Sequence, residues 1–491
     1  MSEYLLFLPI LIPFLGGAFV WCFRTKDAVR NIFIEAIVVL NAAAVWALIL
    51  NRPEGALTLF SFGSKMHVKL SLDGLGSFFL GMASVLWIFV AIYAFSYMKD
   101  EKRTHMFFTF FIFSLAATDG IALAGNLISL YFFYEMLTIV TIPLVIHGCK
   151  KVDMHAGHVY AAYQLGGAAF ALVGIVYLVS VVGIGDFVLG GSFTASASSA
   201  AFGGAPMLEG IYFVMLLGFG VKACLFPLYR WLPTASVAPT PVTALLHAAA
   251  VVKAGIFAIM RLSYYTYGAE FLRGSTVGSV GLWLACFTAV FAAVLAVREH
   301  HFKRRLAYST VSNLSYILIG VLTFTEAGLA AGLCHMLFHA LIKLNAFLTC
   351  GAFMKTGRSQ LEELDGVGYR MPVTFVCYTI SALALAGTPP LTGFISKWHL
   401  LSASAEGDAM IGVAALILSS LLAAIYMLTP SARAFFPARS KHGAVDKNRD
   451  IKEAPLGMTA PMVIFAAANV ILGVFAGPIV SVCEKIAAGL F

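Results

Sequence analysis

The sequence predicts an all-α membrane protein with about fourteen transmembrane helices. Of its 491 residues, 60% are hydrophobic and only 11% are charged, which is more apolar surface than a water-soluble protein can bury. Long apolar runs follow one another along the whole chain. Two of these runs, 218–255 and 371–400, are interrupted by prolines and also carry lysines. Paired broken helices of this kind are typical of the midplane site of a transporter.

Fourteen apolar runs define the predicted spans. They centre near Pro13, Ala42, Ser84, Ser114, Leu137, Ala171, Leu216, Ala250, Ala289, Tyr316, His339, Leu383, Ile417 and Val470. Most basic residues fall in the connections after odd-numbered spans, whereas Arg261 and Arg273 are assigned to the opposite side. The positive-inside rule then places the basic connections in the cytoplasm and both termini outside. We therefore expect a multi-pass protein of the cell inner (plasma) membrane.

Two connections have a distinct composition. Apolar and polar residues alternate over Leu57–Leu72 around Gly63, which predicts a small external hairpin. Val188–Met207 is rich in Gly, Ala and Ser and is expected to form an external loop. The longest polar segment, Ala432–Leu456, is too short for a soluble domain.

The first interrupted run places Lys222, His247 and Lys253 at membrane depth. Its prolines are Pro227, Pro233, Pro239 and Pro241. Each proline lacks an amide proton and clashes with the preceding helical turn, so no straight helix can contain them all. Broken backbone is tolerated in hydrocarbon only where it is packed in protein or lines a wet cavity. A lysine at this depth marks an ion or proton path.

The second interrupted run breaks at Gly387, Pro389, Pro390 and Gly393, and Lys397 follows. These runs are the seventh and twelfth spans, so they occupy matching places in spans 4–8 and 9–13. Because five is odd, the two units would have opposite orientations, as in inverted-repeat transporters. The predicted division is an N-terminal three-helix part (1–105), a first repeat (106–263), an inverted repeat (278–436) and a C-terminal helix (457–491).

The predicted spans contain four lysines and one carboxylate that need an explanation. Among the basic residues, only Lys222, Lys253, Lys343 and Lys397 are expected well inside spans. Glu135 lies in the fifth span. Burial penalises the charged form of each group, and a Glu135–Lys222 pair would keep both charged. Such a pair would be either a tunable element of a proton path or a static buried ion pair.

Three residues of the eleventh span, His335, His339 and Lys343, are spaced four residues apart. This spacing puts them on one helix face with a rise of about 6 Å per step. Histidine titrates near neutral pH, so the set suits proton relay through waters. A zinc site without a third ligand and a simple packing role are the alternatives. We expect Lys343 to be the member that passes charge toward Lys397.

Further polar residues have less defined roles. His247 and Lys253 are six residues apart and on different helix faces, and we favour Lys253 for the path. Asp119 either titrates or caps a kink beside Gly120. The eight cysteines have no metal-binding or disulfide spacing, and no nucleotide or haem motif is present. We therefore expect no cofactor and no metal, and the distribution of the +8 charge argues against nucleic acid as a partner.

Four segments are distinctive, namely FFYEMLTIVTIPLVIH, GFGVKACLFPLYRWLPTASVAPTPVTALLHAAAVVKAG, HMLFHALIK and AGTPPLTGFISKW. They resemble a known family, the antiporter-like proton-pumping subunits of respiratory complex I, membrane-bound hydrogenases and Mrp-type cation/proton antiporters. The chain ends soon after its last span and is most similar to the middle subunits and the Mrp D type. Asp119 matches no family motif.

The resemblance implies roles for individual residues. It matches Glu135 to the fifth-helix glutamate and Lys222 to its partner on the broken seventh helix. It also matches Lys253 to an eighth-helix lysine, Lys397 to the titratable residue of the broken twelfth helix, and His335, His339 and Lys343 to the central ladder.

The resemblance also implies a function: a proton-translocating membrane subunit of a complex I-like dehydrogenase or membrane-bound hydrogenase. The chain shows no catalytic chemistry of its own, so any oxidoreductase activity would belong to the complex. Expected partners are other membrane subunits, including further antiporter-like ones, peripheral redox subunits on the cytoplasmic side, protons or Na⁺, and the lipid bilayer.

Three alternative functions remain open. The first is Na⁺/H⁺ exchange in an Mrp-type assembly. The second is a membrane subunit that serves a carbon-uptake complex, and the third is a non-conducting structural subunit. The retained buried lysines argue against the third.

Overall fold

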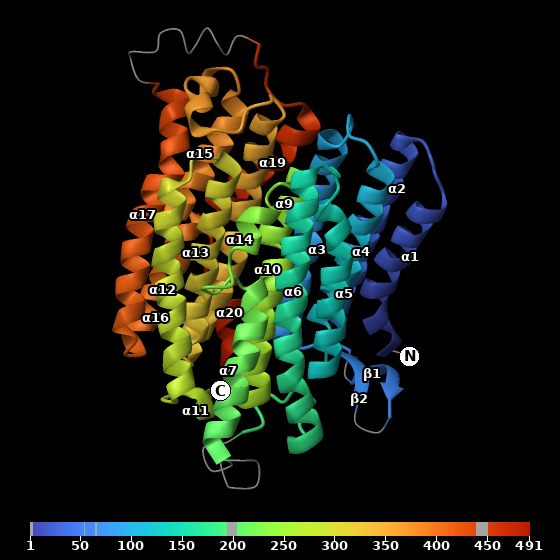
Figure 1. Ribbon diagram of the computed structural model, residues 1–491, viewed down its shortest axis with the longest axis vertical. Helices are drawn as coiled ribbons and strands as arrows, with labels where there is room; N and C mark the ends of the chain where they lie inside the picture. Colours follow the sequence, from blue (N-terminus) through green and yellow to red (C-terminus); the bar gives the residue numbers. More distant parts are fainter. Residues whose placement is uncertain (1–2, 54, 64–65, 194–203, 438–449) are drawn as a thin grey trace.

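The computed structural model describes residues 3–53, 55–63, 66–193, 204–437 and 450–491. The helices lie roughly parallel in one bundle, with a two-stranded hairpin at the lower end of the view (Figure 1). Both termini lie in the lower half of the bundle, and the connection between α14 and α15 lies at its upper end. Residues 194–203 of the predicted loop Val188–Met207 and residues 438–449 of the polar segment lie outside the described residues.

The N-terminal half consists of long helices up to the first break, two of which are extended by short segments. The long helices are α1 (Leu8–Cys22), α2 (Asp27–Asn51), α3 (Gly74–Tyr97), α4 (Thr104–Ala122), α5 (Leu127–Val145), α6 (Lys151–Tyr177) and α7 (Gly204–Lys222). The short segments are η1 (Glu3–Phe7), before α1, and η2 (Leu178–Val182), after α6. Short helices follow the break, namely α8 (Trp231–Ala235), α9 (Thr240–Ala248), α10 (Val251–Met260), η4 (Arg261–Tyr267) and α11 (Ala269–Leu272).

The C-terminal half repeats the pattern of long helices around a break. Its elements are α12 (Thr276–Arg298), α13 (Phe302–Val321), α14 (Glu326–Met354), η5 (Leu361–Leu364), η6 (Val367–Tyr369), α15 (Pro372–Ala386), α16 (Thr392–Glu406), α17 (Met410–Phe435), α19 (Leu456–Val474) and α20 (Gly477–Ala488).

Within the described residues, twelve helical segments are long and apolar enough to cross a bilayer. This confirms an all-helical membrane protein but not the predicted count of fourteen. The two other predicted spans correspond to α13 and to the pair α15 and α16. Helix α13 carries Lys303, Arg304 and Arg305 in its first turn and has a polar middle, and α15 is only 15 residues long. Both are helical, but neither meets the length and apolarity of a simple span.

The hairpin predicted around Gly63 is present. Strands β1 (Ala56–Phe62) and β2 (Met66–Ser71) pair antiparallel. The backbone N–H of Lys69 donates to Ser129 Oγ at 2.7 Å, which ties β2 to the start of α5. The hairpin therefore covers the end of the helix that carries Glu135.

Two segments form the centre of the bundle. Over its most apolar stretch, Thr240–Tyr267 is 100% buried and Glu326–Met354 is 89% buried. Helix α14 packs against α9, α13, α15, α16, α19 and α20, and it runs through the middle of the molecule (Figure 1). Polar side chains on these two segments must therefore face protein or enclosed water, not lipid.

Side-chain caps fix where several helices begin. Asp73 accepts from the backbone N–H of Gly76 at the start of α3, and Asn126 accepts from that of Ser129 at the start of α5, both at 2.8 Å. Thr325 caps α14 in the same way. Each cap satisfies a backbone donor that the first helical turn leaves free. The cap on α14 sets the starting point from which its histidines are spaced.

The placement of Arg261 in an external connection was wrong. Arg261 lies in η4, inside the buried segment Thr240–Tyr267, and its side chain is 1% exposed. Its guanidinium forms a two-pronged ion pair with Asp73, the cap of α3. Burial alone would raise the pKa of the Asp73 carboxyl, but the Arg261 charge and the hydrogen bonds outweigh burial, so that pKa lies below its usual value. A paired arginine is tolerated here because both prongs are satisfied.

Candidate functional site

Lys222 is the last residue of α7, directly before the first break. Its fully buried Nζ donates to the backbone carbonyl of Tyr134 at 2.6 Å and to Thr138 Oγ1 at 2.9 Å, and lies 3.2 Å from the centre of the Tyr134 ring. Trp231 Nε1 donates to the carbonyl of Val221 at 2.7 Å. The break thus leaves a lysine held by α5, and the indole satisfies a helix-end carbonyl as the membrane interior requires.

The predicted direct pair between Glu135 and Lys222 is not formed. No ion pair joins them among the described residues, because the Lys222 ammonium donates to Tyr134 and Thr138 instead. Glu135 is half-buried, and its buried Oε1 has no hydrogen-bond partner in the described part of the chain. Glu135 directly follows Tyr134, whose carbonyl accepts from Lys222 Nζ. Glu135 is therefore close enough to influence Lys222 without neutralising it by contact.

Helix α10 carries the next lysine. It packs so closely on the end of α7 that a methyl group on Gly255 would lie 2.8 Å from Lys222 Cβ. Two residues earlier on α10, Lys253 Nζ lies 2.9 Å from His339 Nδ1 on α14. Lys253 and His339 are both fully buried. A lysine from the eighth predicted span and a histidine from the eleventh therefore touch in the core of the protein.

The histidines of α14 share a face, as their spacing predicted. The ring centres of His335 and His339 are 5.8 Å apart. His335 Nδ1 lies 2.9 Å from Ser396 Oγ on α16, and its ring stacks on Tyr316 at 5.5 Å. The Nε2 atoms of both histidines are buried and have no hydrogen-bond partner among the described residues. Buried polar atoms of this kind are commonly met by ordered water.

The second break holds Lys397. Helix α15 ends at Ala386, and Gly387 adopts a positive φ of 96° in the left-handed region that favours glycine. Lys397 Nζ donates to the carbonyl of Leu385 at 2.6 Å and to that of Ala386 at 3.3 Å. A cation at a helix C-terminus is stabilised by the negative end of the helix dipole. Lys397 therefore satisfies the free carbonyls at the end of α15 while its own side chain stays nearly buried.

Lys343 was expected to pass charge toward Lys397, but its contacts in the structure are with α13 instead. Lys343 Nζ donates to Ser309 Oγ and to the carbonyl of Leu306 on α13. The His335 end of the ladder is the end near Lys397, because both approach Tyr316, whose ring lies 5.6 Å from Lys397 Nζ. The spacing indicates a shared face for these side chains, but it does not show which helix packs on each end of that face.

His247 and Asp119 make their hydrogen bonds to residues other than Lys253 and His339. His247 Nε2 lies 3.4 Å from Ser236 Oγ, and its ring packs on Phe347 at 4.5 Å. Asp119 on α4 accepts from Asn41 Nδ2 on α2 at 2.7 Å, and both side chains are fully buried. The structure thus brings Lys253 into contact with His339 and stacks His339 on His335, whereas His247 and Asp119 are held by Ser236 and Asn41.

The comparisons with known proteins agree with this architecture. Residues 124–423 match the family model "NADH:quinone oxidoreductase/Mrp antiporter, TM". The chain belongs to this family. It is 28% identical over 479 residues to the D-type subunit of a Na(+)/H(+) antiporter from Alkalihalophilus pseudofirmus, covering 97% of this chain and 94% of that protein. It is also 28% identical over 430 residues to the N-type subunit of NADH-quinone oxidoreductase from Desulforudis audaxviator, covering 84% of this chain and 83% of that one.

Two solved structures share the fold of this antiporter-family chain. One is the Mrp complex from Dietzia sp. DQ12-45-1b, with a TM-score of 0.86 and 22% identity. The other is the membrane-bound sulfane sulfur reductase, an archaeal respiratory membrane complex, with a TM-score of 0.84 and 23% identity. Each match covers 100% of this chain and 97% of the other. The antiporter-like membrane fold is therefore established.

Sequence reasoning missed one buried lysine of this family member. Lys303, which was not among the lysines expected well inside spans, is 2% exposed, and its Nζ donates to the carbonyl of Ala238. It lies on the same helical face as Leu306 and Thr310, a spacing that could have indicated burial. Among the described residues no three His, Cys, Asp or Glu side chains cluster as a metal site, so the zinc alternative for His335 and His339 has no third ligand there.

Proposed function

We propose that this chain is a proton-translocating membrane subunit of a multisubunit respiratory-type complex. The observation that carries the proposal is the 2.9 Å contact between Lys253 Nζ and His339 Nδ1, two fully buried titratable groups on different helices. Buried ionisable groups are costly in a membrane protein and mark ion or proton pathways. A chain of them across the middle of the bundle gives protons a route that the apolar helices alone do not offer.

The proton would move along four helices. The residues that would carry it in turn are Lys222 on α7, Lys253 on α10, His339 and His335 on α14, and Lys397 on α16. A hydrogen bond between lysine and Nδ1 of a neutral histidine needs one donor and one acceptor, so the contact is well suited to one shared proton and poorly suited to two. The unpartnered Nε2 atoms of the histidines allow waters to complete the relay.

Glu135 would act as the switch of this chain. A nearby carboxylate favours a proton on a lysine, and Glu135 follows the residue whose carbonyl Lys222 contacts, yet it makes no direct contact that would hold Lys222 in place. A neighbouring subunit that changed the charge near the half-buried Glu135 would weaken that interaction and release the Lys222 proton inward. A pKa change of about two units supplies roughly 2.7 kcal/mol, which exceeds the roughly 2.3 kcal/mol that one charge needs to cross 100 mV.

The proposed arrangement in the membrane follows the charge pattern. Fourteen spans, with α13 and the α15–α16 pair as the two polar or broken ones, would place both termini outside and the basic connections in the cytoplasm. Residues 106–263 and 278–436 would form the two inverted repeats. The common position of the termini in the lower half of the bundle supports an even number of crossings (Figure 1).

The proposed partners are other membrane subunits, further antiporter-like subunits and peripheral redox subunits on the cytoplasmic side. The support is that one relative is named as a subunit of NADH-quinone oxidoreductase and one structural match is a respiratory membrane complex.

A second candidate function is Na⁺/H⁺ exchange in an Mrp-type complex. It is favoured by the similarity, over nearly the whole chain, to a protein named as a subunit of a Na(+)/H(+) antiporter. Purification of the complex separates the two candidates. Co-purifying iron–sulfur or nickel–iron subunits support the redox-linked pump, whereas their absence together with Na⁺-dependent proton release supports the exchanger.

Substitutions of Lys222 test the proposed function. We expect Lys222→Ala to abolish proton translocation in inverted membrane vesicles, and Lys222→Arg to fail to restore it, because arginine keeps its proton at any relevant pH. Exposed Lys151→Ala is the matched control and should translocate normally. Normal proton gradients in vesicles that contain Lys222→Ala at wild-type abundance would refute the proposal. Full activity of Lys222→Arg would show that the site needs only a fixed charge.

A further inference from the structure

A buried polar pair lies in the first four helices, outside the proposed proton path. Asn41 of α2 donates a side-chain N–H to Asp119 Oδ2 of α4 at 2.7 Å, and both side chains are fully buried. Helices α2 and α4 pack with α1 and α3 (Figure 1), and none of these four helices carries a residue of the path. The pair therefore needs an explanation of its own.

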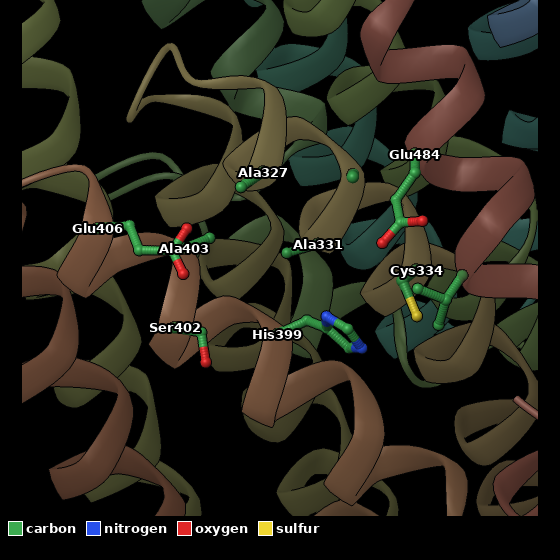
Figure 2. A pocket seen from close by; sticks show the side chains of 10 residues that line it. Ala327, Ala331, Cys334, His399, Ser402, Ala403, Glu406 and Glu484 are labelled. Atoms are coloured by element: carbon green, nitrogen blue, oxygen red, sulfur yellow. The ribbon is translucent and has the colours of Figure 1, made fainter. Parts of the chain in front are cut away.

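A polar cavity in the C-terminal half of the chain adjoins the path instead. It has a volume of about 220 Å³, and its lining includes His399 of α16 and Glu484 of α20 (Figure 2). Two of the helices that line it, α14 and α16, carry His335 and Lys397. Of these two polar features, only the pair on α2 and α4 stands apart from the central titratable residues.

Asp119 lacks a cationic partner among the described residues. It takes part in no ion pair there, and its Oδ1 has no hydrogen-bond partner. A carboxylate that is buried among apolar helices is costly unless its charge is compensated. Asn41 gives it a hydrogen bond but no charge. The site is therefore completed either by a proton on the carboxyl group or by a bound cation.

The pair also leaves two oxygen atoms without a hydrogen-bond donor. An ionised carboxylate can only accept, so Asn41 must present its NH₂ group to Asp119 and direct its own oxygen elsewhere. The Oδ1 atoms of both residues are buried and have no partner in the described part of the chain. In α1, Pro13 has no N–H, so the carbonyl of Pro9 lacks the donor that a regular helix would provide. A third oxygen is thus available on a neighbouring helix.

Two close contacts set the height of α1 relative to the pair. An added Cβ at Gly16 would lie 2.8 Å from Ile37 of α2, and one at Gly17 would lie 2.7 Å from Phe113 of α4. The asparagine follows Ile37 by four residues, and the aspartate follows Phe113 by six. Because α1 runs antiparallel to both helices, the same steps taken backward from the two glycines lead to residues 11–12. The pair thus lies level with residues 11–12 of α1.

The freed carbonyl of α1 points toward this level. Pro9 and Pro13 lie on either side of residues 11–12 and belong to the buried face of α1. Helical carbonyls point toward the C-terminus of their own helix, so the Pro9 oxygen is directed toward the level of Asn41 and Asp119. Three oxygens from three helices therefore lie at one depth in the packed N-terminal part of the bundle.

We infer that the carboxylate of Asp119, the amide oxygen of Asn41 and the carbonyl of Pro9 form a binding site for Na⁺. Hard cations take oxygen ligands, and all three of these groups supply oxygen. One carboxylate balances one positive charge, whereas a divalent ion would leave a charge uncompensated inside the membrane. The close packing at Gly16 and Gly17 favours Na⁺ over the larger K⁺. A proton held by Asp119 is the alternative occupant that the experiment must exclude.

Equilibrium binding of radioactive sodium to the purified complex, without turnover, tests the site. We expect Asp119→Asn and Asn41→Leu each to bind one Na⁺ fewer per chain than the wild type, because the first removes the charge and the second removes a ligand. Thr118→Val is the matched control, since the buried Thr118 hydroxyl donates within α4 to the Ser114 carbonyl at 2.7 Å. It should bind Na⁺ as the wild type does. Equal sodium binding by the wild type and Asp119→Asn would overturn the site.

Carbodiimide modification of the wild-type complex supplies a readout that no folding defect can affect. A hydrophobic carbodiimide reacts with protonated carboxyl groups, and mass spectrometry measures its adduct on Asp119. We expect Na⁺ to suppress this adduct by about tenfold relative to choline at equal ionic strength, because a bound cation favours the ionised carboxylate. An adduct that forms equally in Na⁺ and in choline would identify a carboxyl group that holds a proton, and the inference would be wrong. Neither measurement involves proton translocation, so a failure of this site leaves the proposed function standing.

Discussion

Lys253 Nζ and His339 Nδ1 lie 2.9 Å apart and share one hydrogen bond. When the Lys253 ammonium is the donor, Nδ1 must offer a lone pair, because an ammonium has no acceptor. In that state His339 carries its proton on Nε2, which is buried and has no partner among the described residues. A proton that leaves Lys253 for Nδ1 would therefore favour release of a proton from Nε2 on the far side of the ring. This is the elementary step of a relay.

His339→Gln tests this step. Glutamine has nearly the size of histidine and can still hydrogen-bond Lys253, but it cannot hold an extra proton. We expect translocation to fall by about tenfold or more, with subunit abundance in the membrane unchanged. A packing role predicts the reverse, a pumping protein that assembles poorly. Proton uptake per turnover and subunit abundance, measured in the same membranes, decide between them.

Among the secondary-structure elements, the helix breaks are what position the buried titratable residues. At the first break, Trp231 satisfies the carbonyl of Val221, and at the second, Lys397 satisfies those of Leu385 and Ala386. The prolines made both breaks predictable from the sequence, because proline cannot continue a helix. A third break, between α9 and α10 at Ala249–Ala250, was not predicted. No proline or glycine marks it, so only tertiary packing can account for it.

Gly255→Ala tests the packing of α10 on α7. An added Cβ would lie 2.5 Å from the backbone nitrogen of Ala223 and 2.8 Å from Lys222 Cβ, closer than these atoms allow. We expect a destabilisation of about 1–3 kcal/mol from overpacking, seen as a lower midpoint of thermal unfolding of the purified complex. Gly210→Ala on α7 is the control, because nothing lies within 4 Å of its added Cβ. Equal midpoints for the two variants would contradict the close approach.

For the whole molecule, composition and the interrupted runs were enough to predict a helical membrane bundle with two broken helices, and the alternation around Gly63 predicted the hairpin. The antiporter-like family was predicted only by the resemblance of four segments. Contacts between segments far apart in the sequence could not be predicted from it. The spacing of His335, His339 and Lys343 predicted a shared face, but the ends of that face were assigned to the wrong neighbours. Arg261 was misplaced because a single charge at the end of an apolar run usually marks the end of a membrane span. Its partner Asp73 lies 188 residues away in sequence, so the pairing could not be inferred from local pattern. Such pairings depend on how helices pack, which periodicity does not encode.

Protons are proposed to cross the membrane through the buried titratable residues of this subunit, from Lys222 to Lys397. The most direct test is proton translocation by the assembled complex carrying Lys253→Met, which keeps an unbranched side chain but removes the titratable group. The exposed Lys452→Met is the matched control. In vesicles with equal amounts of subunit, we expect Lys253→Met to lose nearly all proton translocation and Lys452→Met to retain it. Undiminished translocation by Lys253→Met at normal abundance would contradict the account.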